Sequence, residues 1–232
     1  MKQSRRHIKN LELIDRNKEY DLDEATTILI KTSQSKFDES IEMAINLGVD
    51  PKHADQIVRG TVSLPNGIGK DIKVLVFAKD DLADQAEKAG ADFVGSTEMI
   101  EKVKQGWTDV DVVIAAPNMM AEVGKLGKIL GPRGLMPNPK VGTVTSEIGK
   151  AVEESKSGKI EFRVDKNGII HNCIGKLSFE KDKIIENVRV FYNAILQAKP
   201  QTVKGTFMKK ITITSTMGPG IKINKAKILG SS

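Results

Sequence analysis

The most constraining feature of this sequence is a change of hydrophobic pattern that occurs twice, after Gly69 and again at Gly158. Between these points, short apolar runs alternate with helical segments, a spacing typical of a parallel sheet with crossover helices. On either side, apolar residues recur at every second position, as in half-buried strands. The sequence therefore predicts an α/β protein of two domains. A split, mixed α+β sandwich domain is expected at 1–66 and 159–232, with an inserted, Rossmann-like parallel-sheet domain at 67–158.

The predicted split domain combines alternating strands with two helices. A helix over 23–34 is expected to begin at Asp21 or Asp23. The dipeptide Asn167-Gly168 indicates a tight hairpin turn. The other expected segments are a strand at 41–47, a turn-rich stretch at 60–69, hairpin arms at 160–164 and 169–174, a helix at 183–198, and strands at 210–215 and 221–223.

The inserted domain is predicted from its buried apolar runs, because such runs suit strands that are covered on both faces. The expected strands lie at 73–78, 93–94 and 110–116. The expected helices lie at 80–91, 97–105, 119–130 and 146–157, and an irregular segment is expected at 131–142.

Basic residues are distributed unevenly along the chain. The inserted domain holds 12 Lys and Arg against 14 Asp and Glu, whereas the split domain holds 24 against 16. The last 46 residues, after Glu186, contain eight bases and no acid. A basic excess concentrated in one domain favours a polyanionic partner, although a solvated basic tail would have the same composition.

Composition excludes several other classes of protein. The chain of 232 residues is 39% hydrophobic, enough for a packed core. Its apolar runs, such as 112–116, are far shorter than the ~20 residues of a membrane span. Its single cysteine, Cys173, can form no internal disulfide, and its basic N-terminal segment lacks the apolar stretch of a secretory signal. A cytoplasmic protein without membrane contact is expected.

Motifs for catalysis, metals and cofactors are missing from the sequence. The three histidines have no metal-ligand spacing. Six Gly-Lys pairs occur, but none is followed by the Ser or Thr of a phosphate-binding loop. The segment 67–69, Gly-Ile-Gly, lacks the third glycine of a dinucleotide fingerprint. We therefore expect no catalytic residue, no metal and no cofactor.

Three stretches combine cations or hydroxyls with a flexible backbone: 36–40, 215–220 and the Gly- and Pro-rich segment 124–140. Each also has a purely structural interpretation, as a core Phe, a hairpin turn and a rigid connection. Hydroxyls and exposed amides beside glycines suit contacts to ribose and phosphate. Because only 4% of the residues are aromatic, structured RNA recognised by shape is favoured over stacked single strands.

Several segments, taken in order, resemble those of the bacterial ribosomal protein L1 family. The most specific is the long block from Gly131-Pro132-Arg133-Gly134 through Pro137-Asn138-Pro139-Lys140. The shorter ones are Lys36-Phe37-Asp38-Glu39, Arg59-Gly60-Thr61-Val62-Ser63-Leu64-Pro65, Gly90-Ala91-Asp92, Ile160-Glu161-Phe162-Arg163 and Thr216-Met217-Gly218-Pro219.

This resemblance implies a non-enzymatic component of the large ribosomal subunit whose split domain binds the rRNA of the mobile side stalk. The residues implied in RNA binding are Lys36, Phe37, Ser40, Ser215, Thr216, Met217 and Gly218. Ser40 replaces a Thr common in the family and keeps its hydroxyl. Secondary contacts to rRNA or tRNA are implied for Lys125, Lys128, Arg133 and Lys140. Further implied partners are the exit-site tRNA, whose movement and release the protein would assist, and the mRNA leader of its own operon, which it would repress.

Two other classes stay open on the residues alone. An α/β enzyme would bind a nucleotide at the carboxyl ends of the parallel strands. A basic protein–protein adaptor would bind RNA only weakly and with little dependence on salt.

Overall fold

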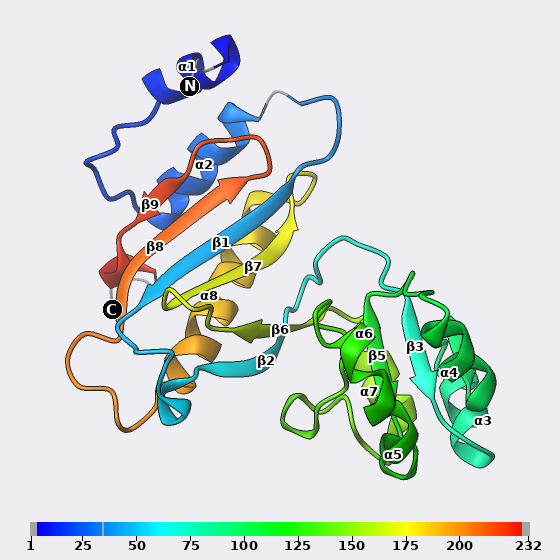
Figure 1. Cartoon of the computed structure of the whole chain (residues 1–232). Coiled ribbons are helices and arrows are strands. Elements are labelled where there is room, and N and C mark those ends of the chain that lie inside the picture. Colours follow the sequence, from blue (N-terminus) through cyan, green and yellow to red (C-terminus); the bar gives the residue numbers. More distant parts are fainter. Residues whose placement is uncertain (1–3, 34, 229–232) are drawn as a thin grey trace. The chain divides into compact units, whose positions relative to one another are not determined.

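The computed structural model describes residues 4–33 and 35–228, and the chain divides into two compact units (Figure 1). The outer unit comprises Met1–Gly69 and Ile160–Ser232, and the inserted unit comprises Lys70–Lys159. The α/β class and the parallel sheet of the inserted segment are as the sequence predicted.

The outer unit is built on a four-stranded sheet in the order β7-β1-β8-β9. Its strands are β1 (Ser40–Leu47), β7 (Ile169–Lys176), β8 (Met208–Ser215) and β9 (Ile221–Ile223). β1 pairs antiparallel with both β7 and β8, so strands from the two ends of the chain form one sheet. Every second residue of β1 is buried, from Ile41 to Leu47, which confirms the predicted period of two.

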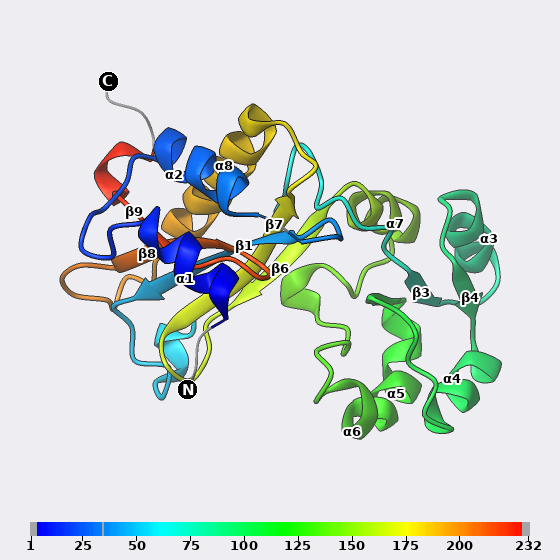
Figure 2. The same cartoon turned by 90° about the horizontal axis from the view of Figure 1, so that it is seen from above.

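Two helices cover one face of this sheet, as Figure 2 shows from above. They are α2 (Leu22–Thr32) and α8 (Lys181–Gln197). α8 buries Ile184, Val188, Phe191 and Ile195 at helical spacing, and these side chains join the core with β1. The remaining helical segments of the outer unit are α1 (Arg5–Glu12), η1 (Ala54–Gln56) and η5 (Lys225–Lys227), and none of the three was predicted.

Two sequence predictions for the outer unit are wrong in part. The segment 60–69 is not all turn, because β2 (Arg59–Ser63) pairs with β6 (Lys159–Arg163) in a separate two-stranded sheet. The turn at 165–168 forms, with Gly168 at a positive φ of 78°. However, its two arms, β6 and β7, belong to different sheets instead of forming the expected hairpin ladder. β6 pairs with a strand more than 90 residues away, a long-range choice that turn chemistry does not reveal.

The inserted unit has a three-stranded parallel sheet in the order β4-β3-β5. The strands are β3 (Val74–Phe77), β4 (Phe93–Gly95) and β5 (Val112–Ala115), and the main helices are α3 (Asp81–Lys88), α4 (Thr97–Lys104) and α7 (Ile148–Lys156). All four residues of β3 are buried, as expected for a central parallel strand.

The helix predicted at 119–130 is broken into four short pieces. They are η2 (Pro117–Met119), α5 (Met120–Val123), η3 (Gly124–Leu126) and α6 (Gly127–Leu130). Gly124 and Gly127 each begin one of these pieces, and glycine is the weakest helix former after proline. The segment that follows is irregular, as predicted, except for η4 (Pro139–Val141).

Candidate nucleic-acid interface

The start of β1 and the end of β8 lie side by side at one edge of the outer sheet. The two strands are antiparallel, and Ile41 is paired with Ser215. The segment that enters β1 and the turn that leaves β8 must therefore emerge together. In this way the fold brings the first two candidate stretches, 36–40 and 215–220, into contact.

Ser40 and Thr216 join the two stretches by three hydrogen bonds. The Ser40 N–H donates to Thr216 Oγ1 at 3.0 Å, and the Thr216 hydroxyl also reaches the Ser40 carbonyl at 3.3 Å. The Thr216 N–H donates to the same carbonyl at 3.1 Å. Much of the hydrogen-bonding capacity of Thr216 is therefore used within the protein, although its side chain is exposed.

Phe37 and Met217 are large apolar side chains that remain in solvent. Phe37 is 55% exposed and Met217 is 47% exposed, and they belong to the two segments that Ser40 and Thr216 join. Lys36 and Thr216 are exposed beside them. Exposed apolar side chains flanked by polar groups are typical of a binding surface.

One predicted site residue, Ser215, is buried beneath this surface, and another, Gly218, is half-buried in the turn above it. Ser215 is only 2% exposed, and Gly218 donates its N–H to the Ser215 carbonyl at 3.0 Å. A Cβ at Gly218 would lie 2.5 Å from Ser215 Oγ, closer than real contacts allow. A side chain at position 218 would therefore force the Ser215 hydroxyl or the turn to shift, and these two residues shape the turn that presents Met217.

Glu39 was given no role from the sequence. It is buried next to the turn that carries Met217. It is 1% exposed, and its carboxylate accepts hydrogen bonds from the Met217 N–H at 3.0 Å and from the Ser33 hydroxyl at 3.1 Å. The Ser35 hydroxyl also donates to it. Burial raises the pKa of Glu39, but the nearby Ser215 hydroxyl and the hydrogen bonds from Ser35 and the Met217 backbone outweigh burial and lower the pKa to about 2.

Lys176 is a second site residue that the sequence analysis missed. It lies opposite Ser40 on β7 and donates from Nζ to Ser40 Oγ at 2.9 Å. On the same side, Ser178 donates its N–H and hydroxyl to the two oxygens of Asp38, at 3.1 and 2.8 Å. Only the register of β1 with β7 reveals these contacts, because more than 130 residues separate the partners.

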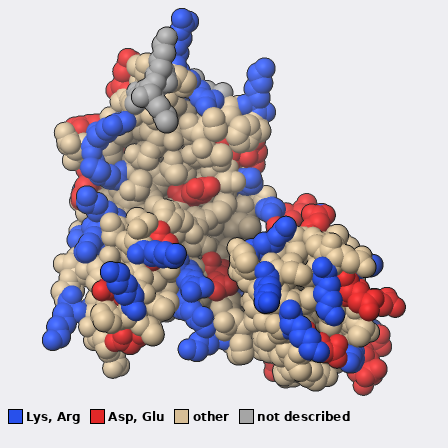
Figure 3. All heavy atoms as spheres, in the orientation of Figure 1, with Lys and Arg blue, Asp and Glu red and all other residues tan. Residues whose placement is uncertain are grey.

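The third candidate stretch lies in the inserted unit and presents its cations to solvent. These are Lys125, Lys128, Arg133 and Lys140, all exposed. The Arg133 guanidinium donates to the Thr108 hydroxyl. Figure 3 shows that Asp and Glu gather along one edge of the inserted unit, whose overall charge is slightly negative. The basic stretch is therefore a local patch on a unit without basic excess.

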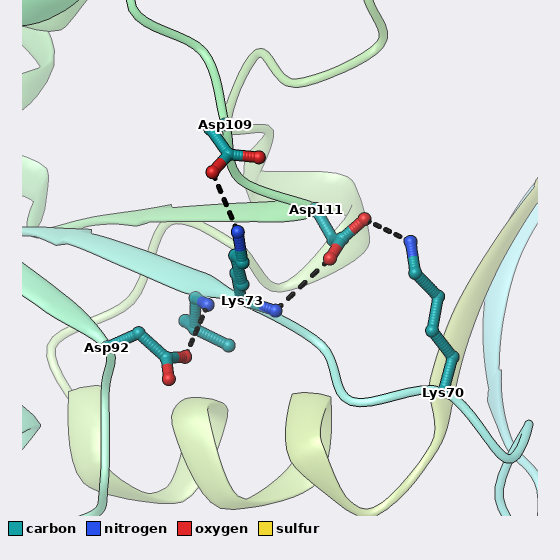
Figure 4. Close-up of polar contacts among 6 residues, drawn as sticks. Lys70, Lys73, Asp92, Asp109 and Asp111 are labelled. Carbon is teal, nitrogen blue, oxygen red and sulfur yellow. Dashed lines mark hydrogen bonds and ion pairs between the residues drawn. The ribbon is translucent and has the colours of Figure 1, made fainter.

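A cluster of charged residues lies at the amino ends of the parallel strands, opposite the end where a nucleotide would bind. Ligands of such sheets bind at the carboxyl ends of the strands. Here Lys73, Asp92 and Asp111 directly precede β3, β4 and β5, as Figure 4 shows. Lys73 Nζ pairs with Asp109 at 2.7 Å, and Lys70 Nζ pairs with Asp111 at 2.5 Å.

The same cluster caps the amino ends of the sheet. Asp111 accepts the Lys73 N–H at 3.2 Å, and Asp92 accepts the Val74 N–H at 2.8 Å. The bond from Val74, together with Lys156, holds the pKa of Asp92 below its usual range despite partial burial. These side chains form ion pairs and hydrogen bonds with each other and with the backbone. The cluster therefore stabilises the inserted unit.

Two general features of the described residues bear on function. No group of three or more His, Cys, Asp or Glu in the described part of the chain is placed to hold a metal ion. Within the same residues, no helix is long and apolar enough to cross a membrane.

Comparison with known protein families matches the chain to the family described as the ribosomal protein L1p/L10e family. It covers residues 29–219, most of the chain, and so spans the inserted unit and both stretches of the candidate interface up to the 215–218 turn.

Proposed function

This chain belongs to the ribosomal protein L1 family, and from that premise we propose that it binds the rRNA of the large subunit's mobile side stalk with the surface around Phe37 and Met217. As a member of this family it is a structural, non-enzymatic component of the large ribosomal subunit that binds rRNA. The proposal concerns which RNA is bound, by which residues, and with what further consequences.

One observation supports the proposed surface most strongly: two segments about 176 positions apart are hydrogen-bonded side by side, with an exposed Phe and an exposed Met between flanking polar groups. In the proposed complex, Phe37 and Met217 pack on riboses or bases. Lys36 binds phosphate, and the Ser40 and Thr216 oxygens bind ribose hydroxyls. Ser215 and Gly218 contribute by shaping the turn.

The charge distribution supports a complex held mainly by the outer unit. That part of the chain has the basic excess, including the acid-free last 46 residues. Each phosphate neutralised releases counterions, so binding should weaken steeply as salt rises.

For the inserted unit we propose a second RNA contact. Its exposed cations at Lys125, Lys128, Arg133 and Lys140 would contact tRNA leaving the exit site, or a secondary part of the rRNA. Through such contacts the protein would assist movement and release of deacylated tRNA. The proposed location of the protein is therefore the cytoplasm, on the ribosome.

The same surface would also bind the mRNA leader of the protein's own operon and repress its translation. This proposal requires the leader to imitate the rRNA site, so the two RNAs must compete for one surface. A labelled stalk rRNA fragment, bound to the protein and titrated with unlabelled leader RNA, should be displaced completely. Formation of a ternary complex, or no displacement by the leader, would contradict the shared site.

A further inference from the structure

We infer that Glu39 is a positioning residue for RNA binding: its buried carboxylate holds the Met217 turn against the segment that presents Phe37. The inference rests on the proposed function, since it explains how the proposed surface keeps its shape. It adds a role for a residue that contacts no RNA and whose charge has the wrong sign for an RNA-binding face.

The presence of an acid here needs an explanation, because phosphates would be repelled by a carboxylate at their surface. Glu39 avoids this conflict by being buried. It is 1% exposed, with the exposed side chains of Phe37 and Met217 on segments adjacent to it. Its carboxylate accepts hydrogen bonds from donors within the protein.

The two carboxylate oxygens bind different segments. Oε2 accepts the Met217 N–H at 3.0 Å, and Oε1 accepts the hydroxyls of Ser33 and Ser35. The backbone carbonyl of Glu39 accepts the Leu177 N–H at 3.0 Å, which fixes the residue to the segment after β7. One side chain thus joins the end of α2, the segment before β1 and the turn after β8.

The Met217 N–H is the donor that most needs this partner. A serine hydroxyl can rotate to another acceptor, whereas a backbone N–H has a fixed direction. The neighbouring turn is also tightly packed, because the Cβ position of Gly218 is only 2.5 Å from Ser215 Oγ. Without an acceptor at Glu39, this N–H would lose its hydrogen bond. The turn would then shift to bring the N–H to another acceptor, and Met217 would move with it.

The sign of the effect distinguishes positioning from simple charge. If Glu39 acted only as a negative charge near RNA, Glu39→Ala would remove repulsion and tighten binding. Positioning predicts the opposite, a loss of about tenfold in affinity for a stalk rRNA fragment, since a hydrogen bond to a charged group is removed. Glu39→Gln keeps one acceptor oxygen for the Met217 N–H and should recover most of the affinity.

Glu42 offers a matched control three positions further along the chain. It is also a glutamate, but it is exposed on β1, and the Met217 N–H donates to Glu39 instead. Glu42→Ala should therefore bind RNA as tightly as the unaltered protein, or more tightly. It should leave the Met217 amide unchanged.

The test measures RNA affinity by gel shift and hydrogen exchange of the Met217 amide in the full-length protein, for Glu39→Ala, Glu39→Gln and Glu42→Ala. Met217→Ala serves as a reference for the proposed site. The inference predicts clearly faster Met217 exchange and weaker binding in Glu39→Ala, a small effect on both in Glu39→Gln and no loss of binding in Glu42→Ala, with unfolding by urea monitored to confirm a folded chain. If Glu39→Ala does not fold, Glu39→Gln decides by showing a small loss with slightly faster exchange.

Two results would overturn the inference in distinguishable ways. Binding by Glu39→Ala at or above the affinity of the unaltered protein, while Met217→Ala is impaired, would reject the positioning role and keep the proposed site. Full binding by Met217→Ala would reject the proposed site, and the inference with it.

Discussion

Met217 donates its backbone N–H to the carboxylate of Glu39 at 3.0 Å, although 178 positions separate the two residues. This bond crosses from the last part of the chain to the first, beside the pairing of β1 with β8. The candidate RNA surface therefore exists only when both ends of the chain fold together. Neither segment alone contains both Phe37 and Met217.

Removing the exposed apolar side chains should weaken RNA binding without loss of stability. Phe37→Ala and Met217→Ala are each expected to reduce affinity for stalk rRNA by about 5–100-fold, the range for contacts between bases and large side chains. Leu196→Ala is the matched control, because Leu196 is 42% exposed on α8 of the same unit. Equal losses of affinity for all three variants in a gel-shift titration would show that Phe37 and Met217 are not part of the RNA-binding site.

Gly218→Ala should weaken RNA binding through the shape of the turn. Its Cβ would lie 2.5 Å from Ser215 Oγ, so either the turn or the buried serine must shift. Gly124→Ala is the control, since a Cβ there meets nothing within 4 Å. Isothermal titration with stalk rRNA should show a loss for Gly218→Ala alone; unchanged affinity would mean that the turn tolerates the displacement.

Gly124→Ala should also stabilise the inserted unit. Gly124 has helical φ and ψ angles of −55° and −31°, and alanine is favoured over glycine in helices by about 0.5–1 kcal/mol. Gly131→Ala should destabilise instead, because its Cβ would lie 2.5 Å from the Gly127 carbonyl. Thermal unfolding followed by circular dichroism tests the pair, and a fall in melting temperature for Gly124→Ala would contradict this account of the broken helix.

Glu39 should make the stability of the outer unit depend on pH in the acid range. Its pKa is about 2 in the folded protein against 4.5 in an unfolded chain. Because the folded pKa is depressed, the stabilisation is complete above pH 4.5 and is lost as pH falls towards 2. The difference in unfolding free energy between the unaltered protein and Glu39→Gln should shrink over this interval. A difference independent of pH would show that ionisation of Glu39 does not stabilise the fold.

A variant in which residues 70–159 are replaced by a short linker should fold and bind stalk rRNA. The outer unit has its own core, formed by β1, β7, β8, α2 and α8, and both stretches of the proposed surface. Affinity close to that of the whole chain is expected at low salt. A folded variant that fails to bind would place essential contacts in the inserted unit.

Local patterns in the sequence were sufficient to predict most strands and helices. The alternation from Ile41 to Leu47 and the buried run at β3 identify their strands because burial imposes the period. Pairing was predicted less well. The composition of 60–69 predicts a turn where β2 begins the segment. The strand is not evident locally because its partner, β6, lies about 100 residues away.

The candidate site was only partly visible in the sequence. Phe37 and Met217 were identified by family resemblance, and their exposure is consistent with the proposed role. Glu39 and Lys176 were missed because a charge in sequence does not show its burial or its partner across a sheet. Asp38 and Glu39 are adjacent acids, yet one is exposed and the other nearly inaccessible, a difference that only the fold creates.

The most direct test of the central claim is a gel-shift titration of the full-length protein against a stalk rRNA fragment and an unrelated RNA duplex, each at two salt concentrations. We predict tighter binding to the stalk fragment, an affinity that falls steeply with salt, and a preference that Met217→Ala abolishes. Equal affinity for the two RNAs, with the same response to salt and to Met217→Ala, would contradict the claim that the joined chain ends form a specific RNA surface.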